Sequence, residues 1–164
     1  SYTVGEKAYG YRGLGDLFVF IFFGLVSVVG AYFLQLKVFS SAAISMALVL
    51  GFLSVAVLNL NNMRDRESDA NVGKRTLAVI LGATGAKYYH YALVICACGV
   101  LFVFFVQQPL SFYWLALLGL IPLSIHLGTV VMNKDPKSLD PELKKVALTI
   151  FFLAILIFIS FSLG

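Results

Sequence analysis

The sequence has little charge and almost no cysteine. Charged residues make up 12% of its 164 residues, and the mean hydropathy is +0.94. A soluble domain carries about 25% charged residues, so this composition excludes a water-soluble globule. A content of 60% hydrophobic residues also excludes a disordered chain. Two cysteines, Cys96 and Cys98, cannot build a disulfide-rich secreted domain. An integral membrane protein remains.

Long apolar runs follow one another along the chain. The five runs cover residues 17–34, 42–60, 88–106, 112–132 and 146–163. Each has about 18 to 21 residues, which as a helix is long enough to cross the hydrocarbon layer. Because apolar residues continue all the way around each run, the runs are typical of helices embedded in lipid. The sequence therefore predicts an all-α, polytopic transmembrane helical bundle with five spans.

Basic residues lie almost entirely on alternate sides of these runs. Eleven of the twelve Lys and Arg residues precede the first run or follow the second or the fourth, and only Lys37 lies on the other side. By the positive-inside rule, the side with eleven is cytoplasmic. We therefore expect a cytoplasmic N-terminus and a C-terminus on the opposite side of the membrane.

The most informative polar segment, NLNNMRDRESDANVGKRTL at 59–77, lies at the cytoplasmic end of the second run. If the helix continues past residue 60, then Asn61, Asp65 and Asp69 lie on one face at a spacing of four. Two carboxylates at this spacing repel each other, and the repulsion grows near hydrocarbon. A divalent cation removes the repulsion, and magnesium is usually held by one or two carboxylates together with substrate phosphates. The segment therefore predicts half of a magnesium–phosphate site.

Cations follow these carboxylates. The segment 73–76, GKRT, supplies a glycine, two cations and a hydroxyl, and Lys74 and Arg75 are side chains that bind phosphate oxygens. The alternative is a solvated basic loop with surface ion pairs such as that of Arg66 with Asp69 or Asp65. The combined spacing favours a site for a metal-bridged diphosphate. It is not a P-loop, because the first glycine of that motif is missing and no strand precedes it.

Two stretches resemble a known family. NNMRDRESDANVGKRTLAV is similar to the second aspartate-rich motif of the intramembrane aromatic prenyltransferases, the UbiA superfamily. AYGYRGLGDLFVFIFFG resembles the segment entering the fifth helix of one branch, the 1,4-dihydroxy-2-naphthoate polyprenyltransferases of menaquinone synthesis. The runs match the last five of that family's nine helices. The resemblance thus implies that 1–164 is the C-terminal part of one prenyltransferase domain, and the opening on Ser1 without an initiator methionine agrees.

The resemblance also implies a reaction. A polyprenyl diphosphate sits with its diphosphate on Mg²⁺, ionises to an allylic cation, and is attacked by the aromatic acceptor. In the naphthoate branch the prenyl chain replaces the carboxylate, which leaves as carbon dioxide, and the product is demethylmenaquinone. The implied partners are these two substrates, membrane lipid and the N-terminal half of the same protein, and the implied location is a bacterial inner (plasma) membrane. No nucleic-acid partner is expected.

Individual roles carry over by position. Asp65 and Asp69 match the catalytic, metal-binding pair, and Asn61 matches the polar position one turn before them. The substrate-binding candidates on the cytoplasmic side are Asn61, Arg64, Lys74, Arg75, Tyr11 and Arg12. An interfacial aromatic residue with a nearby cation is the alternative interpretation of Tyr11 and Arg12. The family's first motif is absent from this chain, so we expect half a metal site and no activity from the chain alone.

Two alternatives stay open at this point. Within the superfamily, the acceptor could be 4-hydroxybenzoate, homogentisate, haem or a chlorophyllide. Outside enzymes, the carboxylates could belong to a cation-binding transporter module. A transporter is expected to have broken helices and polar residues near mid-membrane, whereas these carboxylates lie at the membrane edge, which favours the enzyme.

Two histidines and a connector complete the expectations. His126 lies inside the fourth run, and a neutral histidine hydrogen-bonded to a neighbouring helix is its plainer interpretation. His90 begins the third run, where a polar tip at headgroup level is expected. The segment 140–142, DPE, is expected to open the fifth helix as its cap and first turn.

Overall fold

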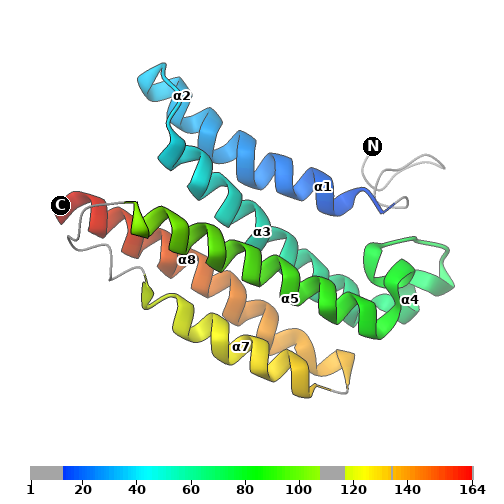
Figure 1. Ribbon diagram of the computed structural model, residues 1–164. Coiled ribbons are helices and arrows are strands. Elements are labelled where there is room, and N and C mark those ends of the chain that lie inside the picture. The colour runs from blue at the N-terminus through cyan, green and yellow to red at the C-terminus, as the bar shows by residue number, and fades with distance from the viewer. Residues whose placement is uncertain (1–12, 108–116, 134, 164) are drawn as a thin grey trace.

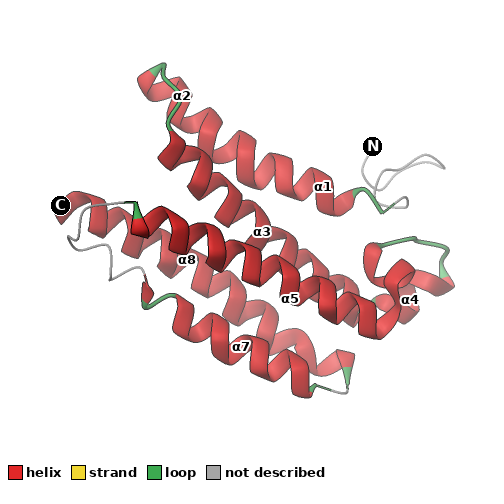
Figure 2. Cartoon of the chain, viewed as in Figure 1, coloured by secondary structure: helices red, strands yellow, loops and turns green. Residues whose placement is uncertain are grey.

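The computed structural model describes residues 13–107, 117–133 and 135–163 (Figure 1). Within these ranges the chain forms helices and connecting turns, with no strand (Figure 2). The expected all-α class is thus confirmed. Two candidate residues, Tyr11 and Arg12, lie outside the described residues, and so does part of the fourth expected span at 112–132.

The chain begins with one continuous helical rod made of three consecutive sections. These are α1 (Gly15–Val19), η2 (Phe20–Gly30), which has π-type spacing, and α2 (Ala31–Leu36). The rod ends where Lys37 adopts a left-handed conformation with φ of 56°. A short turn then leads into α3 (Ser41–Arg64), which runs back alongside the rod.

The next two helices follow the polar motif. The short α4 (Arg66–Asn71) leads to α5 (Leu77–Val106), whose first turn is capped by the Thr76 hydroxyl, which accepts a hydrogen bond from the backbone N–H of Val79 at 3.3 Å. Gly82 interrupts α5 with φ of 71°, a conformation that glycine adopts without steric cost. The helix thus begins at Leu77, well before residue 88, where the apolar run begins. The sequence does not reveal this start, because glycines and a lysine interrupt the apolar pattern of the first turns.

The last part of the chain is a helical hairpin. It comprises α7 (Leu120–Met132), the 3₁₀ turn η3 (Pro136–Leu139) and α8 (Asp140–Leu163). As expected, α8 begins at Asp140 and carries Asp140 and Glu142 in its first turn. Acidic side chains there interact favourably with the positive end of the helix dipole.

Three helical segments in the described part of the chain are long and apolar enough to cross a membrane: Gly15–Leu36, Ser41–Arg64 and Leu77–Val106. The apolar helix Leu120–Val130 is shorter. This finding supports an integral membrane protein and matches the first three expected runs. The total of five spans stays a prediction.

The core lies around α3, which packs against η2, α5 and α8. Its buried side chains come from α3, α5, α7 and α8 and include Leu53, Leu101, Leu123 and Leu153. Large apolar side chains on the outer faces, such as Phe23 and Phe152, are exposed. This distribution is expected when lipid rather than water surrounds the bundle, because exposed apolar surface then has no hydration cost.

The crossing of η2 and α3 depends on two glycines. A Cβ atom on Gly24 would lie 2.7 Å from the carbonyl oxygen of Ala47 and 2.8 Å from Cα of Gly51. A Cβ atom on Gly51 would lie 2.9 Å from the ring of Phe20. The two backbones approach so closely that only glycine fits, as is common where transmembrane helices pack.

The polar connections gather at one end of the bundle. The start of α1, the helix α4, the start of α5 and the connection between α7 and α8 all lie at the right-hand end in Figure 1. A hydrogen bond of 2.7 Å from Arg64 to Asp140 joins the end of α3 to the start of α8 there. The α2–α3 turn with Lys37 lies at the opposite end. This grouping agrees with the alternation of basic residues in the sequence.

Candidate functional site

A cavity of about 280 Å³ opens at this polar end. Three segments far apart in the sequence form it: the start of α1, the last turns of α3 and the residues before α5. Its lining residues are Gly13, Gly15, Asp16, Leu58, Asn61, Asn62, Lys74 and Thr76. Two residues predicted from the motif, Asn61 and Lys74, therefore come together in one cavity with a carboxylate from another helix.

The motif itself keeps the expected spacing without forming one continuous helix. The helix α3 runs on past residue 60 to Arg64, and Asp65, with φ of −92° and ψ of 6°, separates it from α4. The backbone N–H of Asp65 still donates to the carbonyl of Asn61 at 3.0 Å, and that of Asp69 to the carbonyl of Asp65 at 2.8 Å. The helix continues past residue 60, as supposed, but ends at Arg64, so Asp69 lies in the next helix and not in α3.

The carboxylate of Asp65 is held by Arg64. The Nε and Nη2 atoms of Arg64 each lie 2.8 Å from one oxygen of Asp65. Arg64 also donates to the side-chain oxygens of Asn61 and Asp140, at 2.7 Å each. The hydrogen bonds from Arg64 lower the pKa of Asp65 from its ordinary 3.8, and the charges of Arg64 and Lys74 add to this, against a smaller opposing effect of desolvation. Arg64, a substrate-binding candidate, thus directs four of its five N–H donors to protein partners.

The second carboxylate of the motif, Asp69, forms an ion pair with Lys74, the residue that we expected to bind phosphate. Nζ of Lys74 lies 3.0 and 3.1 Å from the two carboxylate oxygens of Asp69, whose residue is only 8% exposed. Gly73, with φ of +73°, turns the chain back so that the backbone N–H of Lys74 also donates to the carbonyl of Asp69 at 2.9 Å. The next cation, Arg75, is exposed.

Comparison with known proteins shows the family to which the chain belongs. Residues 1–156 match the UbiA prenyltransferase family. The chain belongs to this family. The aspartate-rich segment with its basic end is thus a feature of a UbiA protein, and the resemblance inferred from the motif is confirmed. None of the solved structures matches the chain.

Several curated relatives are similar over most of the chain. The 1,4-dihydroxy-2-naphthoate octaprenyltransferase of Haemophilus influenzae is 42% identical over 165 aligned positions, covering 100% of this chain and 52% of the relative. The protein of the same name from Escherichia coli is 43% identical, covering 88% of this chain and 47% of the relative. UbiA prenyltransferase domain-containing protein 1 of Dictyostelium discoideum is 35% identical over 87% of this chain. The chain spans about half the length of the relatives it matches.

The donor set of this UbiA chain fits a shared magnesium–phosphate site better than a metal site built by the chain alone. Among the described residues, no three His, Cys, Asp or Glu side chains are grouped so as to hold a metal ion. Asp65 and Asp69 nevertheless supply the one or two carboxylates that magnesium takes beside substrate phosphates. Each now neutralises a cation of the chain. The residues therefore fit half of such a site.

The structure also places residues in the cavity that the motif did not single out. Asn62 and Asp16 are both nearly inaccessible, at 4% and 5% exposed. The hydroxyl of Tyr89 donates a hydrogen bond to the Asp16 carboxylate, whose Oδ2 atom has no partner. Asp16 lies in the stretch that resembles the fifth-helix segment of the naphthoate branch, but nothing in the sequence pairs it with Tyr89.

A second polar cluster joins the three helices α5, α7 and α8. Nε2 of His90 lies 2.8 Å from Nε2 of His126, and Nδ1 of His126 lies 2.7 Å from Oε2 of Glu142. All three residues are at most 2% exposed. His126 is thus hydrogen-bonded to neighbouring helices, as expected. The interfacial placement expected for His90 is wrong, because α5 begins earlier than predicted and His90 lies well inside it.

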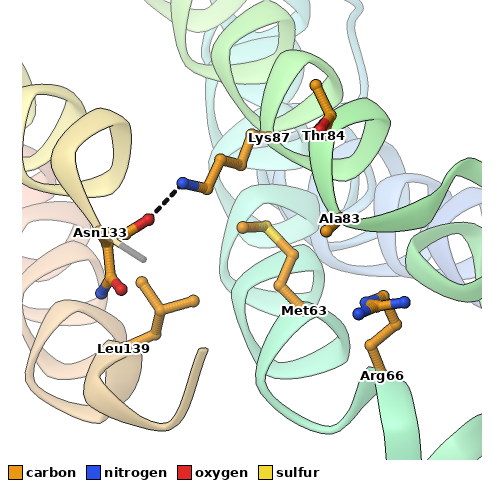
Figure 3. Close-up of a pocket in the computed structure, with 7 residues that line it drawn as sticks. All are labelled: Met63, Arg66, Ala83, Thr84, Lys87, Asn133 and Leu139. Carbon is orange, nitrogen blue, oxygen red and sulfur yellow. Dashed lines mark hydrogen bonds between the residues drawn. The ribbon is translucent and has the colours of Figure 1, made fainter. Parts of the chain in front are cut away.

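A second cavity of about 250 Å³ lies between α3, α5 and the α7–α8 connection (Figure 3). Lys87 reaches across it and donates a hydrogen bond to the carbonyl oxygen of Asn133. Arg66 lies at its edge, and its salt-bridge partner is Glu67 at 3.7 Å rather than either motif aspartate. The ion pair of Arg66 with a motif aspartate, given above as an alternative, is therefore wrong, because Arg66 pairs with Glu67.

Proposed function

We propose that residues 1–164 are the C-terminal part of an intramembrane prenyltransferase of menaquinone biosynthesis. The reaction is transfer of a polyprenyl group from polyprenyl diphosphate to 1,4-dihydroxy-2-naphthoate, with decarboxylation, to give demethylmenaquinol, the reduced form of demethylmenaquinone. Two relatives named for octaprenyl transfer to this acceptor, at 42% and 43% identity, support the proposal. The observation that carries it is the ion-paired Asp69 and Lys74 beside a cavity at the polar end of an apolar bundle.

The ion-paired side chains of the motif can bind the diphosphate and its metal. A polyprenyl diphosphate brings negative charge that competes with Asp69 for Lys74, and Arg75 is exposed beside it. Mg²⁺ held by Asp65, Asp69 and the Asn61 amide oxygen would supply positive charge that stabilises the departing diphosphate. Lys74 and Arg75 add charge-assisted hydrogen bonds to the same phosphate oxygens. Each motif carboxylate would then hold the metal in place of the cationic side chain that it now contacts.

The apolar bundle supports the carbon chemistry. The allylic carbon–oxygen bond to the diphosphate breaks, a carbon–carbon bond forms at the ring carbon that bears the carboxylate, and carbon dioxide leaves. An allylic cation reacts with water unless water is excluded, and the packed helices behind the cavity exclude it. The long prenyl tail runs from the polar end between the helices into lipid.

The missing parts of the site come from outside this chain. The relatives are about twice as long, which supports an N-terminal half that carries the other aspartate motif and completes the metal site. We place the motif end at the cytoplasmic face of a bacterial inner membrane, because the basic residues gather there. Tyr11 and Arg12, which lie outside the described residues, remain candidates for substrate contact.

The test uses the full-length protein in lipid nanodiscs with radiolabelled polyprenyl diphosphate and Mg²⁺. Three acceptors are compared: 1,4-dihydroxy-2-naphthoate, 4-hydroxybenzoate and homogentisate. We expect prenylated naphthoquinol and one equivalent of carbon dioxide from the first acceptor alone. Transfer only to another acceptor would place the protein in a different branch of the family, and no transfer to any acceptor would overturn the proposed activity.

A further inference from the structure

The residue of interest is Asp16, in the first turn of α1. A carboxylate buried at the mouth of an apolar helix is unfavourable unless it has partners. Asp16 is 5% exposed, its Oδ2 atom is buried without a hydrogen-bond partner, and its residue lines the 280 Å³ cavity. An acceptor oxygen left unsatisfied inside a cavity predicts a ligand that donates a hydrogen bond to it.

Tyr89 on α5 fixes the rest of this carboxylate. Its hydroxyl donates a hydrogen bond to the Asp16 carboxylate from the neighbouring helix. The Oδ2 atom of Asp16 has no hydrogen-bond partner in the described part of the chain and is left for a ligand. The pair links α1, which opens the chain's first apolar helix, to α5, which follows the aspartate motif.

The surroundings favour a hydroxyl donor over a metal or a lysine. Asp16 is not grouped with Asp65 and Asp69, because no set of three such side chains in the described part of the chain could share a metal ion. The cation in the same cavity, Lys74, is held by both oxygens of Asp69. The other described residues that line the cavity are neutral: Asn61, Asn62, Leu58, Thr76 and two glycines.

The size of the cavity also discriminates between the two substrates. A volume of about 280 Å³ is at the lower end for ligand pockets, which suits a fused aromatic ring and is too small for a polyprenyl chain. Gly13, with φ of +72°, and Gly15 present no side chain on this wall. A flat ring with a hydroxyl group directed at Asp16 fits these features.

We propose that Asp16 binds a phenolic hydroxyl of the aromatic acceptor, and that Tyr89 is the positioning residue that orients it; this rests on the proposed function. As the ring carbon attacks the allylic cation, the hydroxyl oxygen gains positive charge, and the Asp16 carboxylate stabilises it. No proton has to leave, because departing carbon dioxide returns its electron pair to the ring. Asp16 thus acts on the acceptor, while Asp69 and Lys74 act on the donor.

The experiment measures steady-state kinetics of the full-length protein for each substrate separately. Asp16→Asn keeps the size and polarity of the side chain, Tyr89→Phe removes only the hydroxyl, and Asp135→Asn is an exposed control. A hydrogen bond to a charged group contributes enough for about a tenfold to hundredfold effect. We expect Asp16→Asn to lower kcat/KM for the acceptor by that factor, Tyr89→Phe to lower it less, and the KM for the donor to stay within about twofold.

A second measurement begins with the wild-type protein and so does not depend on whether a variant folds. Methyl ethers of 1,4-dihydroxy-2-naphthoate lack one hydroxyl hydrogen each, and the wild-type protein should bind one of them at least about tenfold more weakly than the parent. Asp16→Asn should lose most of this discrimination.

The outcomes are separable. If wild type transfers to no acceptor, the proposed function fails and takes this inference with it. If wild type is active but binds every methyl ether as well as the parent, the inference alone fails. An Asp16→Asn effect confined to the donor KM or the magnesium requirement would also overturn it, and would place Asp16 on the diphosphate side.

Discussion

Lys74 and Asp69 bind each other, with Nζ of the lysine 3.0 and 3.1 Å from the two carboxylate oxygens. We expected Lys74 to bind phosphate and Asp69 to bind the metal. In this structure Lys74 therefore takes the place of the metal at Asp69, and Asp69 takes the place of the phosphate at Lys74. The Asp69 side chain is largely buried, and a buried carboxylate is unfavourable without a partner. The pair should therefore open only when a phosphate anion and a metal cation arrive together and re-pair both groups.

Replacing Asp69 tests the metal half of this arrangement. In the full-length protein, Asp69→Asn keeps the size of the side chain but removes its charge, and we expect prenyl transfer to fall at least about 100-fold at saturating magnesium. Glu67→Gln, on the exposed side of the same helix, is the matched control and should stay within about twofold. Unchanged turnover of Asp69→Asn would remove this residue from the proposed site.

Replacing the cations tests the phosphate half. Lys74→Ala and Arg75→Ala should each raise the donor KM, by about tenfold if one charge-assisted hydrogen bond is lost. The acceptor KM should hardly move in either variant. Kinetics with the two substrates varied in turn separate these effects, and a change confined to the acceptor would contradict the assignment.

The pH dependence of stability tests the Arg64–Asp65 pair. The pKa of Asp65 is lowered in the folded state from its ordinary 3.8, so its contribution is present at all pH values above that figure and is lost as the pH falls through the folded-state value. The difference in thermal midpoint between wild type and Asp65→Asn should stay constant from about pH 8 to pH 5 and shrink below about pH 4. A difference that grows on acidification would contradict the pairing.

The buried chain from His90 through His126 to Glu142 should matter for folding rather than for substrate binding. His126→Ala leaves a buried carboxylate and a buried imidazole without their partner, which costs about 1–3 kcal/mol per unsatisfied group. We expect a clearly lower thermal midpoint for His126→Ala and a smaller loss for Glu142→Gln, which can still hydrogen-bond. Both substrate KM values should stay unchanged in whichever variant remains folded. An unaltered midpoint would show that the cluster contributes nothing to stability.

Much of the fold follows from apolar run length alone. Runs without charge predict the helices 15–36 and 41–64 to within a few residues, since crossing lipid demands about 20 apolar residues. The start of α5 was missed because Gly82, Gly85 and Lys87 interrupt its apolar pattern, although Thr76 is a typical N-cap. The π-type section of the first helix could not be predicted, because the apolar run carries no signal for it.

The site was predictable where it is local in sequence. The spacing of Asn61, Asp65 and Asp69 gives their register directly, and the family resemblance rests on it. Which cation pairs with which carboxylate was not predictable, because the break at Asp65 and the turn at Gly73 set the directions of these side chains. Contacts between distant segments, such as Tyr89 with Asp16 or Arg64 with Asp140, carry no local signal at all.

The most direct test of the central claim is a structure of the full-length protein with Mg²⁺ and an unreactive polyprenyl thiodiphosphate. We predict that the diphosphate lies against residues 61–75, with Lys74 moved from Asp69 onto a phosphate oxygen and the motif carboxylates facing the metal. A diphosphate bound far from this segment, with the Lys74–Asp69 pair still closed, would contradict the account.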